Sequence, residues 1–283
     1  MNLPDVTIKE LLEAGVHLGH KTFRWNPKMK EFIFGSKNSI HIIDLVQTLE
    51  MTNAALVEIH KCISSGGKIL FVSTKKQAAG TIANLAKDTS QFYVNHRWLG
   101  GMLTNWNTIS NSIKRYKKLS LDLKKESTGF TKKENLKMGK ERDKLERSLG
   151  GIADMKKIPD MIFIIDTNAE DLAVKEASKL NIPIVAIVDS NSDPTRINFP
   201  IPGNDDARRA ISLYCDVVKK TILDAQRNIS IEIDENLKNE EKKEKPPKNE
   251  TKKVDTKKKE INKIPKKIAT SFFSKVKSLT SKK

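Results

Sequence analysis

Cysteine is scarce in this 283-residue sequence, which contains only Cys62 and Cys215. Because no CxxC pair is present, a metal ribbon has no support, and both thiols are expected to be small buried groups in a reducing compartment. The sequence has no apolar run of roughly 18 residues, so we expect no membrane-spanning helix. It also has no basic segment followed by an apolar stretch at its start, which predicts a cytoplasmic protein without a secretory signal.

Motifs of common α/β enzymes are missing as well. The loop at 73–77 reads STKKQ and contains no glycine, and no GxGxxG, Walker lysine, GxSxG or HExxH motif occurs in the sequence. The residues therefore favour a protein that is not an enzyme and needs no cofactor. A nucleotide- or metal-dependent enzyme on a doubly wound sheet remains the alternative function.

Basic residues outnumber acidic residues throughout the chain, with a formal net charge of +17. Residues 1–234 contain 35 Lys or Arg against 28 Asp or Glu, and residues 235–283 contain 17 Lys against 7 acids. A basic body indicates a polyanionic partner, which is either nucleic acid or an anionic membrane surface.

The hydrophobic pattern predicts an α/β fold. Continuous apolar strands are expected at 68–72, 91–94, 161–166 and 184–189, with an edge strand at 198–201, and helices at 45–63, 77–87, 169–180 and 205–226. Apolar strands that alternate with helices are typical of a parallel sheet covered on both faces. Before this alternation, residues 15–30 are expected to form an irregular loop, and residues 32–43 a short hairpin around Gly35-Ser36.

One insertion interrupts the alternation between the second and third strands. It is longer than a crossover needs, and glycine pairs stand at 100–101 and 150–151. Helical spacing on both sides of a turn at 127–130 predicts two antiparallel helices that protrude as a coiled-coil hairpin. We therefore expect a discontinuous α/β domain over 1–101 and 150–234, with the hairpin at 102–149.

The remaining segment, 235–283, is rich in Lys, Glu, Pro and Asn. Such a composition buries too little apolar surface to fold alone, so a disordered tail is expected. Residues 264–279 carry apolar side chains at helical spacing, which leaves a membrane-surface adaptor as a further alternative.

Basic and aromatic residues gather in three places that we predict to bind RNA. They are Arg24, Trp25, Lys28 and Lys30 in the first loop, His96 and Arg97 after the second strand, and Lys114, Arg115, Lys117 and Lys118 in the hairpin. Cations neutralise phosphates, and flat rings stack on bases. Core packing is the competing interpretation of Trp25 and Trp98.

Acidic residues follow the strands, where ligands of such sheets bind. His17, Asp189 and Asp205 would form a zinc site if the first loop folded over this edge. The competing interpretation is structural: Asp205 would begin a helix, and Asp189 would hold a turn.

Four motifs resemble the bacterial small-subunit ribosomal protein two family. They are AGVHLGHKTFRWNPKM at 14–29, FYVNHRWLGGMLTNW at 92–106, IVDSNSDP at 187–194 and IPGNDDARRA at 201–210. They occur in the order found in the family, and the resemblance covers about residues 6–226.

The resemblance implies a Rossmann-like domain with a protruding coiled-coil hairpin and a structural role in the small ribosomal subunit. The family binds small-subunit ribosomal RNA and helps to recruit the neighbouring ribosomal protein one. Carried over by motif, the RNA-facing residues would be Arg24, Trp25, Lys28, His96, Arg97 and the start of the hairpin.

Overall fold

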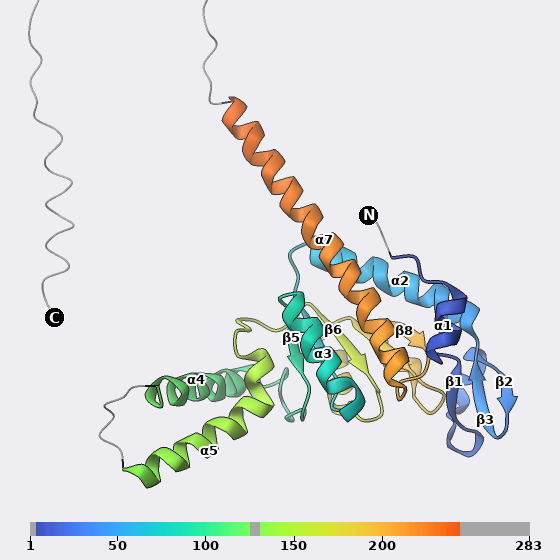
Figure 1. Cartoon of the computed structure of the whole chain (residues 1–283), viewed down its shortest axis with the longest axis horizontal. Coiled ribbons are helices and arrows are strands. Elements are labelled where there is room, and N and C mark those ends of the chain that lie inside the picture. Colours follow the sequence, from blue (N-terminus) through green and yellow to red (C-terminus); the bar gives the residue numbers. More distant parts are fainter. Residues whose placement is uncertain (1–3, 125–130, 244–283) are drawn as a thin grey trace, which may run out of the picture. The chain divides into compact units, whose positions relative to one another are not determined.

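The computed structural model describes residues 4–124 and 131–243, with side chains described through residue 229. A five-stranded parallel sheet lies at its centre, in the order β5-β4-β6-β7-β8 (Figure 1). Its strands are β4 (Ile69–Val72), β5 (Phe92–Val94), β6 (Met161–Ile165), β7 (Ile184–Val188) and β8 (Phe199–Pro202). The α/β fold predicted from the sequence is confirmed, and the two prolines of β8 are tolerated because β8 is an edge strand.

Both faces of the sheet are buried. Phe71 and Phe163 point to one face, which is covered by α1 (Ile8–Ala14), α2 (Leu45–Ser64), α3 (Lys76–Asp88) and α7 (Arg208–Lys243). Val72 and Ile164 point to the other face, which is covered by α6 (Asp171–Lys179) and the base of the hairpin insertion. Because each face of the sheet packs against its own hydrophobic core, side chains on both faces are apolar, and the strands appear in the sequence as continuous apolar runs.

A second, three-stranded antiparallel sheet precedes α2. It contains β1 (Leu18–Lys21), β2 (Ile33–Lys37) and β3 (Ile40–Ile43) in the order β1-β3-β2. The predicted hairpin exists, but its turn lies at Asn38 and Ser39, whose φ angles are 52° and 60°, and not at Gly35-Ser36. Part of the expected first loop forms β1, and the rest forms the short helices η1 (Thr22–Arg24) and η2 (Pro27–Phe32).

The insertion forms the expected helical hairpin, which we call the arm. Its helices are α4 (Trp106–Asp122) and α5 (Lys132–Leu149), and they run side by side (Figure 1). At the base, Ile109, Ile113 and Leu149 are buried, whereas Leu121 and Leu136 further along the arm are exposed. The turn expected at 127–130 lies outside the described residues.

The arm is preceded by a turn that Glu176 of α6 organises. The Glu176 carboxylate accepts hydrogen bonds from Trp98 Nε1 at 3.0 Å and from the backbone nitrogens of Gly101, Leu103 and Thr104 at 2.8, 2.9 and 3.1 Å. Burial favours the neutral acid, but these hydrogen bonds outweigh it and hold the pKa of Glu176 below its ordinary value. Trp98 is therefore a core residue, 6% exposed.

The arm returns to the sheet through η3 (Gly150–Ile152). A Cβ atom on Gly151 would lie 2.0 Å from the backbone oxygen of Tyr93, so only glycine permits this approach. The described residues up to 238 form one compact unit that contains both helices of the arm. The division at 101 and 150 into separate domains stays a prediction.

The last helix, α7, continues to Lys243, and the tail boundary expected at 235 stays a prediction. Lys, Glu and Leu favour helix in this stretch. The remainder of the predicted tail, including 264–279, lies outside the described residues. Within the described ranges, no helix combines the length and apolar character needed to span a membrane.

We predict that Glu176→Gln destabilises the protein by about 2 kcal/mol, because an amide nitrogen cannot accept the hydrogen bonds of one carboxylate oxygen. Urea denaturation measures this loss, and hydrogen exchange should accelerate at the amides of Gly101, Leu103 and Thr104. Glu50→Gln, on the exposed side of α2, is the control and should change neither measurement. Unchanged exchange in Glu176→Gln would contradict the assigned role.

Candidate nucleic-acid interface

The first basic loop lies between β1 and β2 and is fixed to the large sheet by its backbone and by one buried side chain. Asn26 N donates to Ser190 O at 2.8 Å, and the Asn26 side chain accepts from Lys28 N at 3.0 Å. Met29 is fully buried. The loop is therefore held as a shaped surface, which reduces the entropy lost when it binds a partner.

Three predicted residues of this loop, Arg24, Trp25 and Lys30, are exposed. Trp25 is 37% exposed, so it is not a core residue, and its ring centroid lies 5.4 Å from that of His41. The Arg24 guanidinium lies over the Phe23 ring, 5.4 Å from its centroid. Cations and accessible rings are thus adjacent on this surface.

Lys28 differs from its neighbours because it is engaged with the protein itself. Its Nζ lies 2.7 Å from Asp193 Oδ2 and 3.2 Å from Thr195 Oγ1. Hydrogen bonds from Lys28 and Thr195 lower the pKa of Asp193 to about 2. The charge of Lys28 is compensated by Asp193, so Lys28 connects the loop to η4 (Pro194–Arg196).

The second predicted cluster follows β5. His96 and Arg97 are exposed, whereas the adjacent Trp98 is buried against Glu176. A cleft of about 340 Å³ lies beside His96 and is also lined by Tyr93 and Arg147. Two solvent-facing side chains, His96 and Arg97, therefore stand directly before the buried Trp98.

The four predicted residues of the arm all lie on α4 and are exposed. Arg115 forms an ion pair with Glu141 of α5, and Lys117 Nζ lies 2.9 Å from Asp154 Oδ1. Lys114 and Lys118 are four residues apart and therefore share one side of the helix. The arm thus presents cations, but Arg115 also joins its two helices, and Lys117 also joins α4 to the segment after η3.

The carboxyl edge of the large sheet holds a cluster of charged residues around Lys75. Its Nζ lies 2.9 Å from Asp166, 2.8 Å from Asp205 and 2.7 Å from Asp206. Burial alone would lower the pKa of Lys75, but these carboxylates outweigh it and raise that pKa above its ordinary value. At this edge, an ammonium group occupies the position where doubly wound sheets bind ligands.

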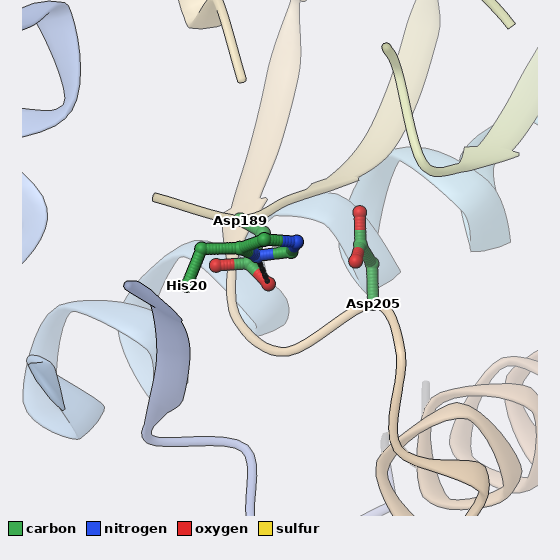
Figure 2. A group of neighbouring side chains, drawn as sticks. All are labelled: His20, Asp189 and Asp205. Atoms are coloured by element: carbon green, nitrogen blue, oxygen red, sulfur yellow. Dashed lines mark hydrogen bonds and ion pairs between the residues drawn. The ribbon is translucent and has the colours of Figure 1, made fainter. Parts of the chain in front are cut away.

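The imidazole at this edge belongs to His20 and not to His17, the residue expected from the sequence. His20 Nδ1 lies 2.8 Å from Asp189 Oδ2, and this hydrogen bond raises the pKa of His20. His20, Asp189 and Asp205 each offer one potential metal-ligand atom, and these three atoms lie within 4.8 Å of one another (Figure 2). His17 Nδ1 is buried, and no hydrogen-bond partner is found for it among the described residues. The first loop does fold over the edge, as the zinc hypothesis required.

The backbone explains why His20 reaches the edge. The pairing of β1 with β3 is irregular between Leu18 and Lys21, and such a bulge redirects side chains. His20 N donates to Ser190 Oγ at 2.9 Å, and a Cβ on Gly19 would lie 2.9 Å from the same oxygen. Gly19 was the sequence feature that could have indicated His20, since a residue without a side chain permits the close approach of β1 to Ser190.

Asp205 is fully buried, and burial together with the negative charge of Asp189 raises its pKa to about 7. Asp205 Oδ1 contacts Lys75, whereas Asp205 Oδ2 has no hydrogen-bond partner among the described residues. Asn204, and not Asp205, accepts from the first backbone nitrogens before α7, at 2.9 and 3.0 Å. The structural interpretation of Asp205 as a helix cap is therefore wrong.

We predict that Lys28→Met returns the pKa of Asp193 from about 2 toward its ordinary value of 3.8. The stabilisation from this pair is present above the ordinary pKa and is lost as pH falls through the folded pKa, so the variant loses this contribution. A carboxyl NMR titration measures the shift. Lys30→Met is the matched control, and an unshifted Asp193 in Lys28→Met would refute the assignment.

Known proteins resemble this chain over most of its length. The family model described as Ribosomal protein S2 matches residues 11–225. The chain is 58% identical over 224 residues to proteins of Sinorhizobium medicae and Parvibaculum lavamentivorans, and 57% identical to one of Brucella suis; each alignment covers 79% of this chain and 88% of the relative. All three relatives are named small ribosomal subunit protein uS2. The chain therefore belongs to the ribosomal protein S2 family, a family of structural ribosomal proteins and not of enzymes.

Proposed function

We propose that this protein is a structural constituent of the small ribosomal subunit in the cytoplasm and binds small-subunit ribosomal RNA. The main supporting observation is that Arg24, Trp25, Lys30, His96 and Arg97 are exposed on loops whose neighbouring residues are buried anchors. The curated relatives are named as small-subunit proteins, which agrees with this role.

The chemistry of the two loops suits folded RNA. Arg24 and Arg97 carry planar guanidinium groups that can bind phosphate oxygens through two hydrogen bonds at once. The loops are held by Ser190 and Glu176, so little conformational entropy is lost on binding. Lys114 and Lys118 of the arm add charge that strengthens binding without reading sequence.

We further propose that the protein docks ribosomal protein one for translation. This proposal is supported by the four motifs that resemble the family, because members of that family help to recruit ribosomal protein one. The arm and the exposed parts of the α/β domain provide surface for both protein and RNA partners, and the same experiment tests both.

Charge reversal of Arg24 and Arg97 together should reduce incorporation into small subunits at least tenfold, because each substitution replaces attraction to phosphate with repulsion. Subunits lacking this protein would be incubated with the variant, separated by sedimentation and quantified. Retention of ribosomal protein one in the same fractions measures the docking role.

The matched control is Lys9→Glu with Lys61→Glu, which changes net charge equally on α1 and α2. Both control residues are exposed. Normal incorporation of the Arg24 and Arg97 variant would contradict the proposed interface. A loss equal to that of the control would show an effect of net charge and would contradict it as well.

A divalent metal site is a second proposal, supported by the unpartnered and fully buried Asp205 Oδ2 beside His20 and Asp189, as found among the described residues. One imidazole and two carboxylates form a ligand set that suits zinc. Lys75 competes for Asp205, so binding would require its ammonium to shift toward Asp166 and Asp206.

Zinc at 100 times its dissociation constant should stabilise the full-length protein by about 2.7 kcal/mol against unfolding, because it binds only the folded state. Thermal denaturation with zinc and with chelator measures this difference. His20→Ala should abolish it, whereas the control His96→Ala should retain it. Equal unfolding with zinc and with chelator would exclude the site.

A further inference from the structure

The second helix of the arm, α5, carries a row of cations that the sequence analysis did not single out. Five basic residues recur at intervals of four, three, four and three positions, and this spacing places their side chains on one side of a helix. They are Lys133, Lys137, Lys140, Lys144 and Arg147, and we call them the α5 row. All five are exposed. At a rise of about 1.5 Å per residue, the row is about 21 Å long.

The charges of the α5 row are not compensated by the protein itself. None of the five cations forms an ion pair with another described residue, whereas the acids of α5 are engaged with other groups. The pairs are Glu141 with Arg115, Asp143 with Arg142 and Glu146 with Arg142, and Glu134 belongs to the capping box with Thr131. The positive charge of the row therefore remains available to a partner.

Keeping five like charges in one row works against the stability of the helix. Neighbouring members of the row stand three or four positions apart, and like charges at these spacings destabilise a helix. A sequence selected for a stable arm alone would place acids at some of these positions, since opposite charges at the same spacings stabilise it. The row therefore indicates a partner that supplies the missing negative charge.

The α5 row meets the second basic cluster of the α/β domain. A hollow of about 320 Å³ beside α5 is lined by Lys140, Lys144 and Arg147. Arg147 also lines the cleft of about 340 Å³ beside His96. The acids that line these two hollows are the two that pair with Arg142. The base of the α5 row and His96 therefore lie on one continuous surface.

We propose that the α5 row binds the phosphate backbone of double-helical RNA and extends the RNA-binding surface that begins at His96 and Arg97. Lysine and arginine neutralise phosphates without reading bases. Residues 132–149 contain no aromatic side chain, and single strands are held mainly by bases that stack on rings, so the composition of α5 favours a duplex. This inference rests on the proposed RNA-binding function and assigns the main contact of the arm with RNA to α5.

Two triple variants at the same positions separate charge from local structure. Lys137→Gln, Lys140→Gln and Lys144→Gln together remove three charges of the row, and arginine at the same three positions keeps them. Both variants should fold, because glutamine and arginine have helix propensities close to that of lysine and the three side chains are exposed. Circular dichroism of each full-length variant checks that the helices are retained.

The matched control combines Lys9→Gln, Lys61→Gln and Lys179→Gln. These substitutions remove the same number of charges from exposed positions on α1, α2 and α6, away from the arm. A comparison of the two glutamine variants therefore separates contacts made by the α5 row from a general effect of net charge.

Binding of each full-length variant to isolated small-subunit ribosomal RNA would be measured over a range of salt concentrations. The glutamine variant of the row should bind about tenfold more weakly at moderate salt, and its slope of log affinity against log salt should fall by about two, because each lost phosphate contact contributes roughly 0.7 to 0.9. The arginine variant and the matched control should keep the slope of the original chain.

A competition experiment tests the form of the RNA. A short RNA duplex should displace the original chain from the ribosomal RNA more effectively than an unpaired strand of the same length. This difference should shrink in the glutamine variant of the row, because the duplex loses its contacts with α5. More effective competition by the unpaired strand would refute the assignment to a duplex.

An unchanged salt slope in the glutamine variant of the row would overturn the inference, and so would an equal loss in the matched control. Weakened assembly into subunits together with normal binding to isolated RNA would assign the row to a protein partner and would overturn it as well. If charge reversal at Arg24 and Arg97 still weakens RNA binding in these cases, the proposed function stands and the role of α5 alone fails.

Discussion

Carboxylates at the ends of the parallel strands determine where the first basic loop lies. Asp189 holds His20, the neighbouring Ser190 accepts from Asn26, and Asp193 pairs with Lys28. Each contact joins residues more than 160 positions apart in the chain. The negative edge of the large sheet thus fixes the small, positive sheet beside it, and the exposed cations depend on this attachment for their position.

The same edge explains how a parallel α/β sheet serves a structural role. The ends of the strands are where doubly wound sheets bind ligands, yet Lys75 and His20 fill this region with contacts to Asp166, Asp205 and Asp189. The edge is used to join parts of the protein. The exposed cations named above lie on the loops and the arm.

Hydrophobic periodicity predicted the strands, the helices and the arm because their apolar residues follow regular patterns, as in the fully buried β6 and β7. It could not predict β1, whose exposed Leu18 and irregular pairing leave no clear alternation. The exposed loop cations were predicted from the sequence. Which histidine reaches Asp189, His20 or His17, depends on the bulge in β1 and could not be predicted in this way. Glu176 gave no signal at all, because its partners are mostly backbone amides more than 70 positions away.

The close approach at Gly151 has a consequence for how the arm can vary. The contacts that fix the arm lie at its base: the Glu176 turn, the buried Ile109 and Leu149, and the glycine against Tyr93. Whole helical turns added to or removed from the far end would leave these contacts intact. The reach of the arm is therefore free to evolve, or to be engineered, separately from the direction in which it leaves the domain.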